Sequence, residues 1–147
     1  MRLLLLLALL APAGCGGNPT DGTPVGAVRL FVTAVQRGSE DRRGLEEAYR
    51  LLSEPTRAQL ATRARMTAAL GAGEREPWEM LVEGTAHTRF TPRPGGYREH
   101  RDEADPDRAV VTVSGRDPSD VAEIPVVREE DGWRIVMEIP ALTPPSE

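Results

Sequence analysis

The spacing of the apolar residues changes once along this chain, near residue 78. Before that point, apolar side chains recur every three or four residues, which is the period of an amphipathic helix. After it, apolar and polar side chains alternate between turn signals, as in strands that bury one face. A block of helices followed by a block of strands predicts an α+β domain, with helices packed on one face of a curved antiparallel sheet.

The first helix is predicted from Pro24 to Gly38, with Thr23 as its N-cap. Threonine is a favoured cap, proline suits the first helical position and glycine commonly ends a helix. The polar and charged residues 36–37 and 40–43 predict a solvated turn. A second helix is expected over 45–52.

A third helix is expected to follow Ser53 as N-cap and to end before Gly71. Alternation then predicts strands, of which the second is strongly polar and suited to a sheet edge. Pro125 places its strand at an edge or a bulge, and Asp131-Gly132 is a hairpin signal. The predicted strands cover residues 82–91, 97–103, 109–114, 121–127 and 133–139.

The N-terminus has the order of a secretory signal. Met1-Arg2 is a short basic start, Leu3 to Ala11 is an apolar run, and small residues lead to Cys15. Nine apolar residues span about 14 Å as a helix, which is half the hydrocarbon core of a bilayer. The run is therefore too short for a membrane span, and we expect it to be cleaved.

Ala13-Gly14-Cys15 resembles a lipobox, the signal that bacterial lipoprotein maturation enzymes read, although Pro12 stands where that family prefers leucine. The resemblance implies that the Cys15 thiol is lipidated and anchors an exported protein to the cell envelope. Gly16, in the place where inner-membrane retention usually shows aspartate, favours the outer membrane if the cell has two membranes. An ordinary cleaved signal is the alternative.

Composition excludes several classes of function. The net charge is -5, which argues against nucleic-acid binding by charge neutralisation. The chain has no lysine, which excludes Schiff-base chemistry and a phosphate-loop lysine. Cys15 is the single cysteine, so the chain forms no internal disulfide and offers no thiolate metal site. No cofactor is indicated.

The helix-then-sheet order resembles the NTF2-like superfamily, an α+β cone also found in lipoproteins of unknown function. The resemblance rests on the first helix, on Ala48 to Ser53 with Arg57 and Leu60, and on Asp131 to Ile135. Together with the lipobox, it divides the chain into a signal peptide at 1–14, a lipidated cysteine and tether at 15–22, the NTF2-like domain at 23–140 and a tail at 141–147. Members of this superfamily commonly pair through the sheet, so the resemblance also allows a homodimer.

The resemblance implies a pocket between the concave sheet face and the helices. Large adaptable side chains are the candidates for its lining, with ordinary core packing as the alternative. Trp78 is of special interest because it lies where the helices give way to strands. The candidate lining residues are Trp78, Met80, Phe90, Tyr97, Trp133 and Met137.

The sequence contains no catalytic motif. His87 and His100 are the candidate bases, but each alternates with polar neighbours and is expected to face water. The acidic run 102–107 lacks the glycine turn and the spaced glutamate of a calcium loop. The sequence therefore predicts a non-enzymatic, lipid-anchored envelope protein that binds a partner protein or a small apolar ligand. A small hydrolase or isomerase using the pocket is the alternative.

Overall fold

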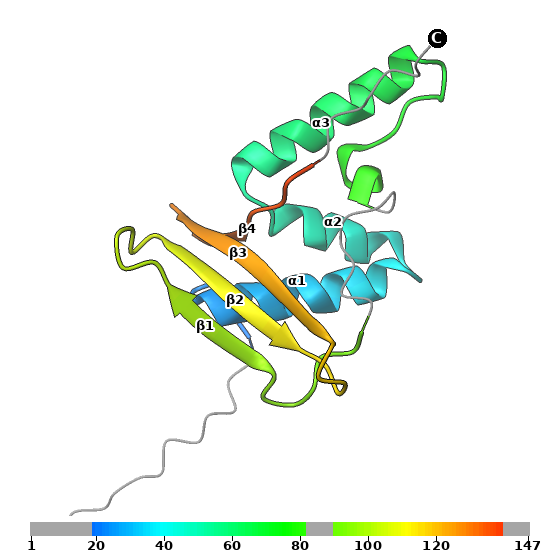
Figure 1. Cartoon of the computed structure of the whole chain (residues 1–147). Helices are drawn as coiled ribbons and strands as arrows, with labels where there is room; N and C mark the ends of the chain where they lie inside the picture. The colour runs from blue at the N-terminus through cyan, green and yellow to red at the C-terminus, as the bar shows by residue number, and fades with distance from the viewer. Residues whose placement is uncertain (1–18, 82–89, 140–147) are drawn as a thin grey trace, which may run out of the picture.

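The computed structural model describes residues 19–81 and 90–139 (Figure 1). Three helices precede four strands, and the strands form one antiparallel sheet in the order β1-β2-β3-β4. This arrangement confirms the α+β class. The elements are α1 (Pro24–Gly38), α2 (Arg42–Arg50), α3 (Glu54–Ala69), the 3-10 helix η1 (Pro77–Leu81), β1 (Tyr97–Arg101), β2 (Arg108–Ser114), β3 (Val121–Glu129) and β4 (Gly132–Ile135).

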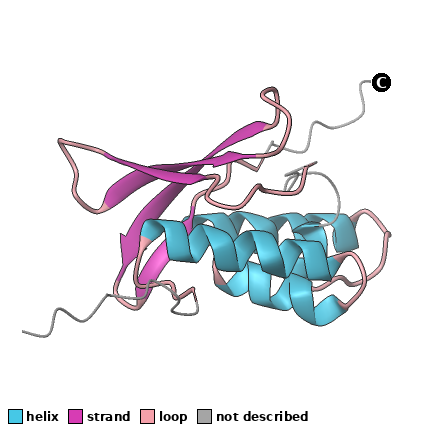
Figure 2. Ribbon diagram, turned by 90° about the horizontal axis from the view of Figure 1, so that it is seen from below, coloured by secondary structure: helices cyan, strands magenta, loops and turns pink. Residues whose placement is uncertain are grey.

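The domain has two layers, with the helices on one side of the sheet (Figure 2). Val28 and Phe31 of α1 pack against the buried face of the sheet, where Val111 and Ile135 are also inaccessible to solvent. Fully burying one such side chain contributes about 1.5–3 kcal/mol. The alternation of buried residues along β2 confirms the period-two pattern expected for that strand.

The first helix has the predicted bounds. The Thr23 hydroxyl oxygen accepts a hydrogen bond from the Gly26 N–H at 3.1 Å, which confirms the N-cap. The prediction of a turn over 36–37 and 40–43 is wrong at both ends, because α1 continues to Gly38 and α2 begins at Arg42. Asp41 starts α2 early, since its carboxylate accepts the Arg43 N–H at 3.0 Å.

Helix α3 extends away from the sheet and packs mainly on η1 (Figure 1). Ser53 is its N-cap residue, but the Ser53 hydroxyl makes no cap bond and instead pairs with the Thr56 hydroxyl at 2.9 Å. Thr56 Oγ1 also accepts the Met137 N–H at 3.2 Å. These bonds tie the start of α3 to the chain that leaves β4.

The prediction of a strand over 133–139 is wrong beyond Ile135, and Pro125 explains why. Opposed residues in an antiparallel pair exchange two hydrogen bonds. Val136 donates its N–H to the Pro125 carbonyl at 2.9 Å, but proline has no N–H to return. The ladder therefore stops at Ile135. Pro125 lies in an interior strand and not at the predicted sheet edge, although its nitrogen faces the side where β4 has ended.

Two other strand predictions have different outcomes. The polar strand expected over 97–103 is β1, and it lies at an edge of the sheet as predicted. Of the strand expected over 82–91, residues 82–89 lie outside the described residues, and Phe90 and Thr91 belong to no strand. Within the described residues, no helix is both long and apolar enough to cross a membrane.

Candidate functional site

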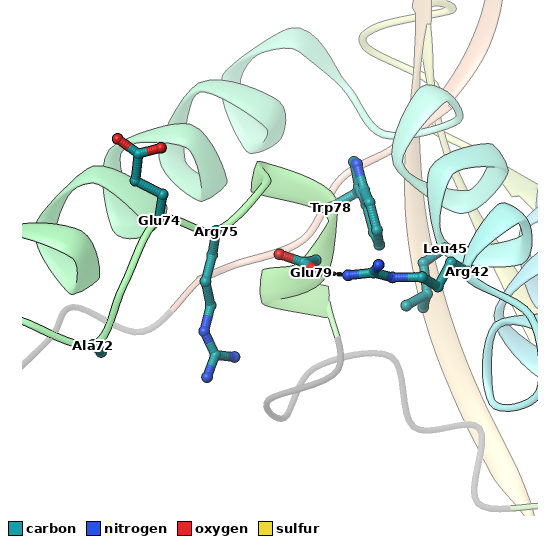
Figure 3. Close-up of a pocket in the computed structure, with 7 residues that line it drawn as sticks. All are labelled: Arg42, Leu45, Ala72, Glu74, Arg75, Trp78 and Glu79. Atoms are coloured by element: carbon teal, nitrogen blue, oxygen red, sulfur yellow. Dashed lines mark hydrogen bonds and ion pairs between the residues drawn. The ribbon is translucent and has the colours of Figure 1, made fainter.

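A solvent-open groove lies between α3, η1 and the start of α2 (Figure 3). It consists of two adjoining cavities of about 500 and 730 Å³. The cavities share five lining residues, so they form one continuous surface that we call the Trp78 groove. The shared residues are Arg42, Glu74, Arg75, Trp78 and Glu79.

Local sequence explains how the groove forms. Gly71 and Gly73 adopt left-handed φ angles of 84° and 82°, which glycine accepts without strain, and there the chain leaves α3 and turns back. Met80 and Leu81 then bury themselves in the core and hold η1 against α2 and α3. Trp78 is left half-buried beside the first turn of α2.

Arg42, Trp78 and Glu79 form one cluster in the groove (Figure 3). The Arg42 guanidinium lies 5.3 Å from the centre of the Trp78 ring, within cation–π range. The same guanidinium pairs with Glu79 Oε1, while Glu79 Oε2 accepts the Glu76 N–H at 2.9 Å. Cation–π contact at an exposed site contributes about 0.5–1 kcal/mol. The cluster thus fixes the indole orientation and leaves its environment open to water.

The groove combines apolar and charged surface. Small apolar side chains line it from α3 and the following loop, among them Ala61, Ala64 and Ala72. Arginine and glutamate side chains stand beside them in equal numbers, so the groove has no strong net charge. Leu70, between lining residues Ala68 and Ala72, is 81% exposed. Of the residue types that line the groove, tryptophan and arginine are those enriched at protein-binding surfaces.

The six predicted lining residues lie in different environments. Met80 and Trp133 are buried in the core, while Phe90, Tyr97 and Met137 are partly buried against it. Trp78 is half-buried and lines the groove described above. That all six line a common pocket under the sheet stays a prediction.

The other predicted candidates carry little chemistry in the described residues. His100 is exposed on β1, and His87 and Cys15 lie outside the described residues. In the acidic turn, the Asp102 and Asp105 carboxylates accept N–H groups of that same turn at 2.9 and 3.1 Å. No group of three or more potential metal ligands occurs within residues 19–81 and 90–139.

Sequence reasoning missed a buried arginine. Arg134 alternates with Trp133 and Ile135, so the pattern assigned its side chain to the solvated face, yet it is only 6% exposed. Its guanidinium pairs with Asp21 at 2.8 Å and with Asp131 at 2.7 Å. Its Nε is buried without a hydrogen-bond partner in the described structure. The hairpin acid Asp131 three residues earlier was the one sequence signal of this pairing.

Several carboxylates have a pKa below the ordinary value. A hydrogen bond from Arg134 lowers the pKa of Asp131 from 3.8, and the Glu76 N–H and Arg42 lower that of Glu79 from 4.5. Hydrogen bonds from Ser119 lower the pKa of Asp117 in the same way. Each group stabilises the fold above its unfolded pKa, and this contribution disappears as pH falls through the folded value.

We therefore expect stability to decline as pH falls below about 4. Urea unfolding of the wild type and of Asp131→Asn, at pH 7 and at pH 3, measures the contribution of that carboxylate. The variant is expected to be less stable at pH 7, and the difference is expected to shrink at pH 3, because protonation of Asp131 removes the charge that pairs with Arg134. A stability difference that is the same at both pH values would contradict the assignment.

Comparison with known proteins returned no match: no family model, no curated protein and no solved structure is similar to this chain. The fold and the groove therefore stand on the residues described above.

Proposed function

We propose that this chain is a lipid-anchored protein of the cell envelope whose domain binds a segment of a partner protein in the Trp78 groove. The domain is proposed to be an NTF2-like cone, which three helices on one face of an antiparallel sheet support. The lipid anchor is supported by the apolar run before Ala13-Gly14-Cys15. Envelope location follows from that anchor, and Gly16 favours the outer membrane if the cell has two membranes.

The openness of the groove is the observation that favours a partner protein over a small apolar ligand. Sites for small apolar molecules enclose most of the ligand surface. The Trp78 groove is open along its length and lined by exposed arginine and glutamate side chains. An extended polypeptide can place apolar side chains on the alanine strip and pair its polar groups with both signs of charge. A partner protein is therefore favoured over a small apolar ligand.

The anchor is tested by Cys15→Ser in a bacterium that processes lipoproteins. The wild type is expected to enter the membrane fraction and to carry acyl chains by mass spectrometry, because two or three acyl chains give stable anchoring. The variant is expected in the soluble fraction. A variant that stays on membranes would contradict lipid attachment at this cysteine.

The groove is tested by selecting peptides that bind the protein and measuring their affinity for Trp78→Ala. An aromatic anchor at the centre of an interface contributes about 2 kcal/mol, so affinity should fall roughly thirtyfold. Val121→Ala is the matched control, since Val121 is an exposed apolar residue on β3, outside the groove. Equal losses in both variants would contradict the groove, and binding of small apolar compounds alone would contradict the choice of ligand.

A further inference from the structure

The segment before α1 is fastened to β4 through Asp21. The Trp133 N–H donates to the Asp21 carbonyl oxygen at 2.8 Å, and Arg134 Nη1 donates to Asp21 Oδ2 at 2.8 Å. Arg134 also pairs with Asp131 in the β3–β4 turn. One backbone bond and one largely buried ion pair thus hold the same residue. We call this set of contacts the Asp21 latch.

Two glycines let this segment lie close to the domain. A Cβ at Gly26 would stand 1.9 Å from the Thr20 carbonyl oxygen, which is far inside van der Waals contact. A Cβ at Gly132 would stand 3.0 Å from the Asp21 carbonyl oxygen and 3.1 Å from Arg134 Nη1. The backbone at Thr20 and Asp21 therefore packs directly on α1 and on the β3–β4 turn.

The latch limits how far the domain can move from Cys15. Asp21 lies six residues after Cys15, and a chain of that length reaches at most about 20 Å in any conformation. The β1–β2 turn lies at the same end of the domain, because the Arg128 N–H donates to the Asp107 carbonyl at 2.7 Å. An anchor at Cys15 keeps both turns near the membrane.

This end of the domain is acidic. Residues 101–108 and 128–134, together with Asp21, carry eight carboxylates and four guanidinium groups. Anionic headgroups repel such a surface over a Debye length of about 8 Å at physiological salt. The acidic turns therefore do not adsorb to an anionic bilayer. The short connection between Cys15 and Asp21 holds this end of the domain near the membrane, but the domain does not lie against the lipid.

The Trp78 groove lies at the other end. Figure 1 shows the C-terminal end of α3 directed away from the place where the described chain begins. The exposed apolar side chains of α3 and its cap are there, with Met66 46% exposed in addition to Leu70. This surface points to the aqueous compartment when the acidic end faces the lipid.

We infer that the Asp21 latch orients the anchored domain, with the acidic turns toward the membrane and the Trp78 groove toward a partner in the aqueous compartment. The inference rests on the proposed lipid attachment at Cys15. It deepens the proposed function because it places the partner: a polypeptide approaching from the aqueous side, and not one embedded in the same membrane.

Paramagnetic broadening tests the orientation. The full chain, isotope-labelled and matured in a lipoprotein-processing bacterium, is reconstituted into nanodiscs that contain a gadolinium-chelating lipid. Amide signals of 101–108 and 128–132 are expected to broaden, while those of 66–73 keep the intensity measured without gadolinium. Equal broadening at both ends, or broadening confined to 66–73, would overturn the inference.

A second arm separates this test from the test of the anchor. If mass spectrometry finds no acyl chains, the proposed anchor fails, and Cys15 of the same chain is coupled to a maleimide lipid in nanodiscs. The coupled protein must then show the same gradient of broadening, since the latch and the chain length are unchanged. A uniform pattern overturns the orientation whatever the origin of the lipid.

The latch itself is tested by Asp21→Asn, which keeps the side-chain shape and removes the charge that pairs with Arg134. Broadening is expected to spread toward residues 66–73 while the chemical shifts of the core stay native. Asp117→Asn is the matched control, because Asp117 lies in the β2–β3 turn and, among residues 19–81 and 90–139, its carboxylate accepts hydrogen bonds from Ser119 of that same turn. An unchanged gradient in Asp21→Asn would overturn the role of the latch.

Discussion

Replacing Gly44 by alanine is expected to destabilise the domain by about 3 kcal/mol, the upper part of the range for overpacked cores. Gly44 is buried where α2 crosses α1. A Cβ there would stand 2.4 Å from the Gly38 nitrogen and 2.6 Å from the Ala34 carbonyl oxygen. Both neighbours are backbone atoms of α1, so no side chain can rotate away and the helices must separate.

Intrinsic helix propensity works in the opposite direction. Alanine is favoured over glycine inside a helix by about 1 kcal/mol, so a local argument predicts that Gly44→Ala stabilises the protein. Urea unfolding decides between these effects. Gly22→Ala is the matched control, because a Cβ at Gly22 meets only the Thr20 hydroxyl at 3.5 Å, an ordinary contact. A Gly44→Ala protein as stable as the wild type would contradict the close packing of α1 on α2.

Replacing Arg134 by alanine is expected to cost about 3 kcal/mol, the lower part of the range for removing one partner of a buried ion pair. The loss includes the bonds to Asp21, Asp131 and the Trp133 carbonyl. It also includes the packing of the apolar stem. The lower part of the range applies because the Asp21 side chain is 38% exposed and that of Asp131 is 74% exposed, so neither carboxylate is left buried when the guanidinium is removed.

Two further variants separate charge from packing at this position. Arg134→Met keeps the stem and should recover part of the loss, whereas Arg134→Lys should recover little because a single ammonium cannot reach two carboxylates as a planar fork does. Arg116→Ala, at an exposed arginine in the β2–β3 turn, should stay within about 0.5 kcal/mol of the wild type. The urea midpoints of the four variants are compared with that of the wild type. An Arg134→Ala midpoint equal to that of Arg116→Ala would contradict a stabilising latch.

Much of the fold follows from local patterns. Thr23 and Pro24 start α1 where cap chemistry predicts, and the alternation of Ala109, Val111 and Val113 predicts both β2 and its buried face. The polar sequence of β1 predicts its edge position. These predictions succeed because each depends on backbone geometry and on side chains within a few residues along the chain.

The candidate site was predicted only in part. Trp78 was singled out because it stands at the change of period, and it lines the groove. Its partner Arg42 could not be found in this way, since Arg42 was assigned to a solvated turn and meets Glu79 across 37 residues of chain. No local pattern records which of many surface arginines will stack on an indole.

The sequence alone determined the order of the elements, the α+β class and the edge strand, because periodicity and capping are properties of contiguous residues. The anchor at Cys15 stays a prediction from the same kind of local signal. The tertiary structure decided where β4 ends, which arginine is buried and how the groove is assembled. Each of these depends on a partner distant in the chain: Pro125 for Val136, Asp21 for Arg134, and Arg42 for Trp78 and Glu79. Such pairings exist only after the helices pack on the sheet and exclude water between them.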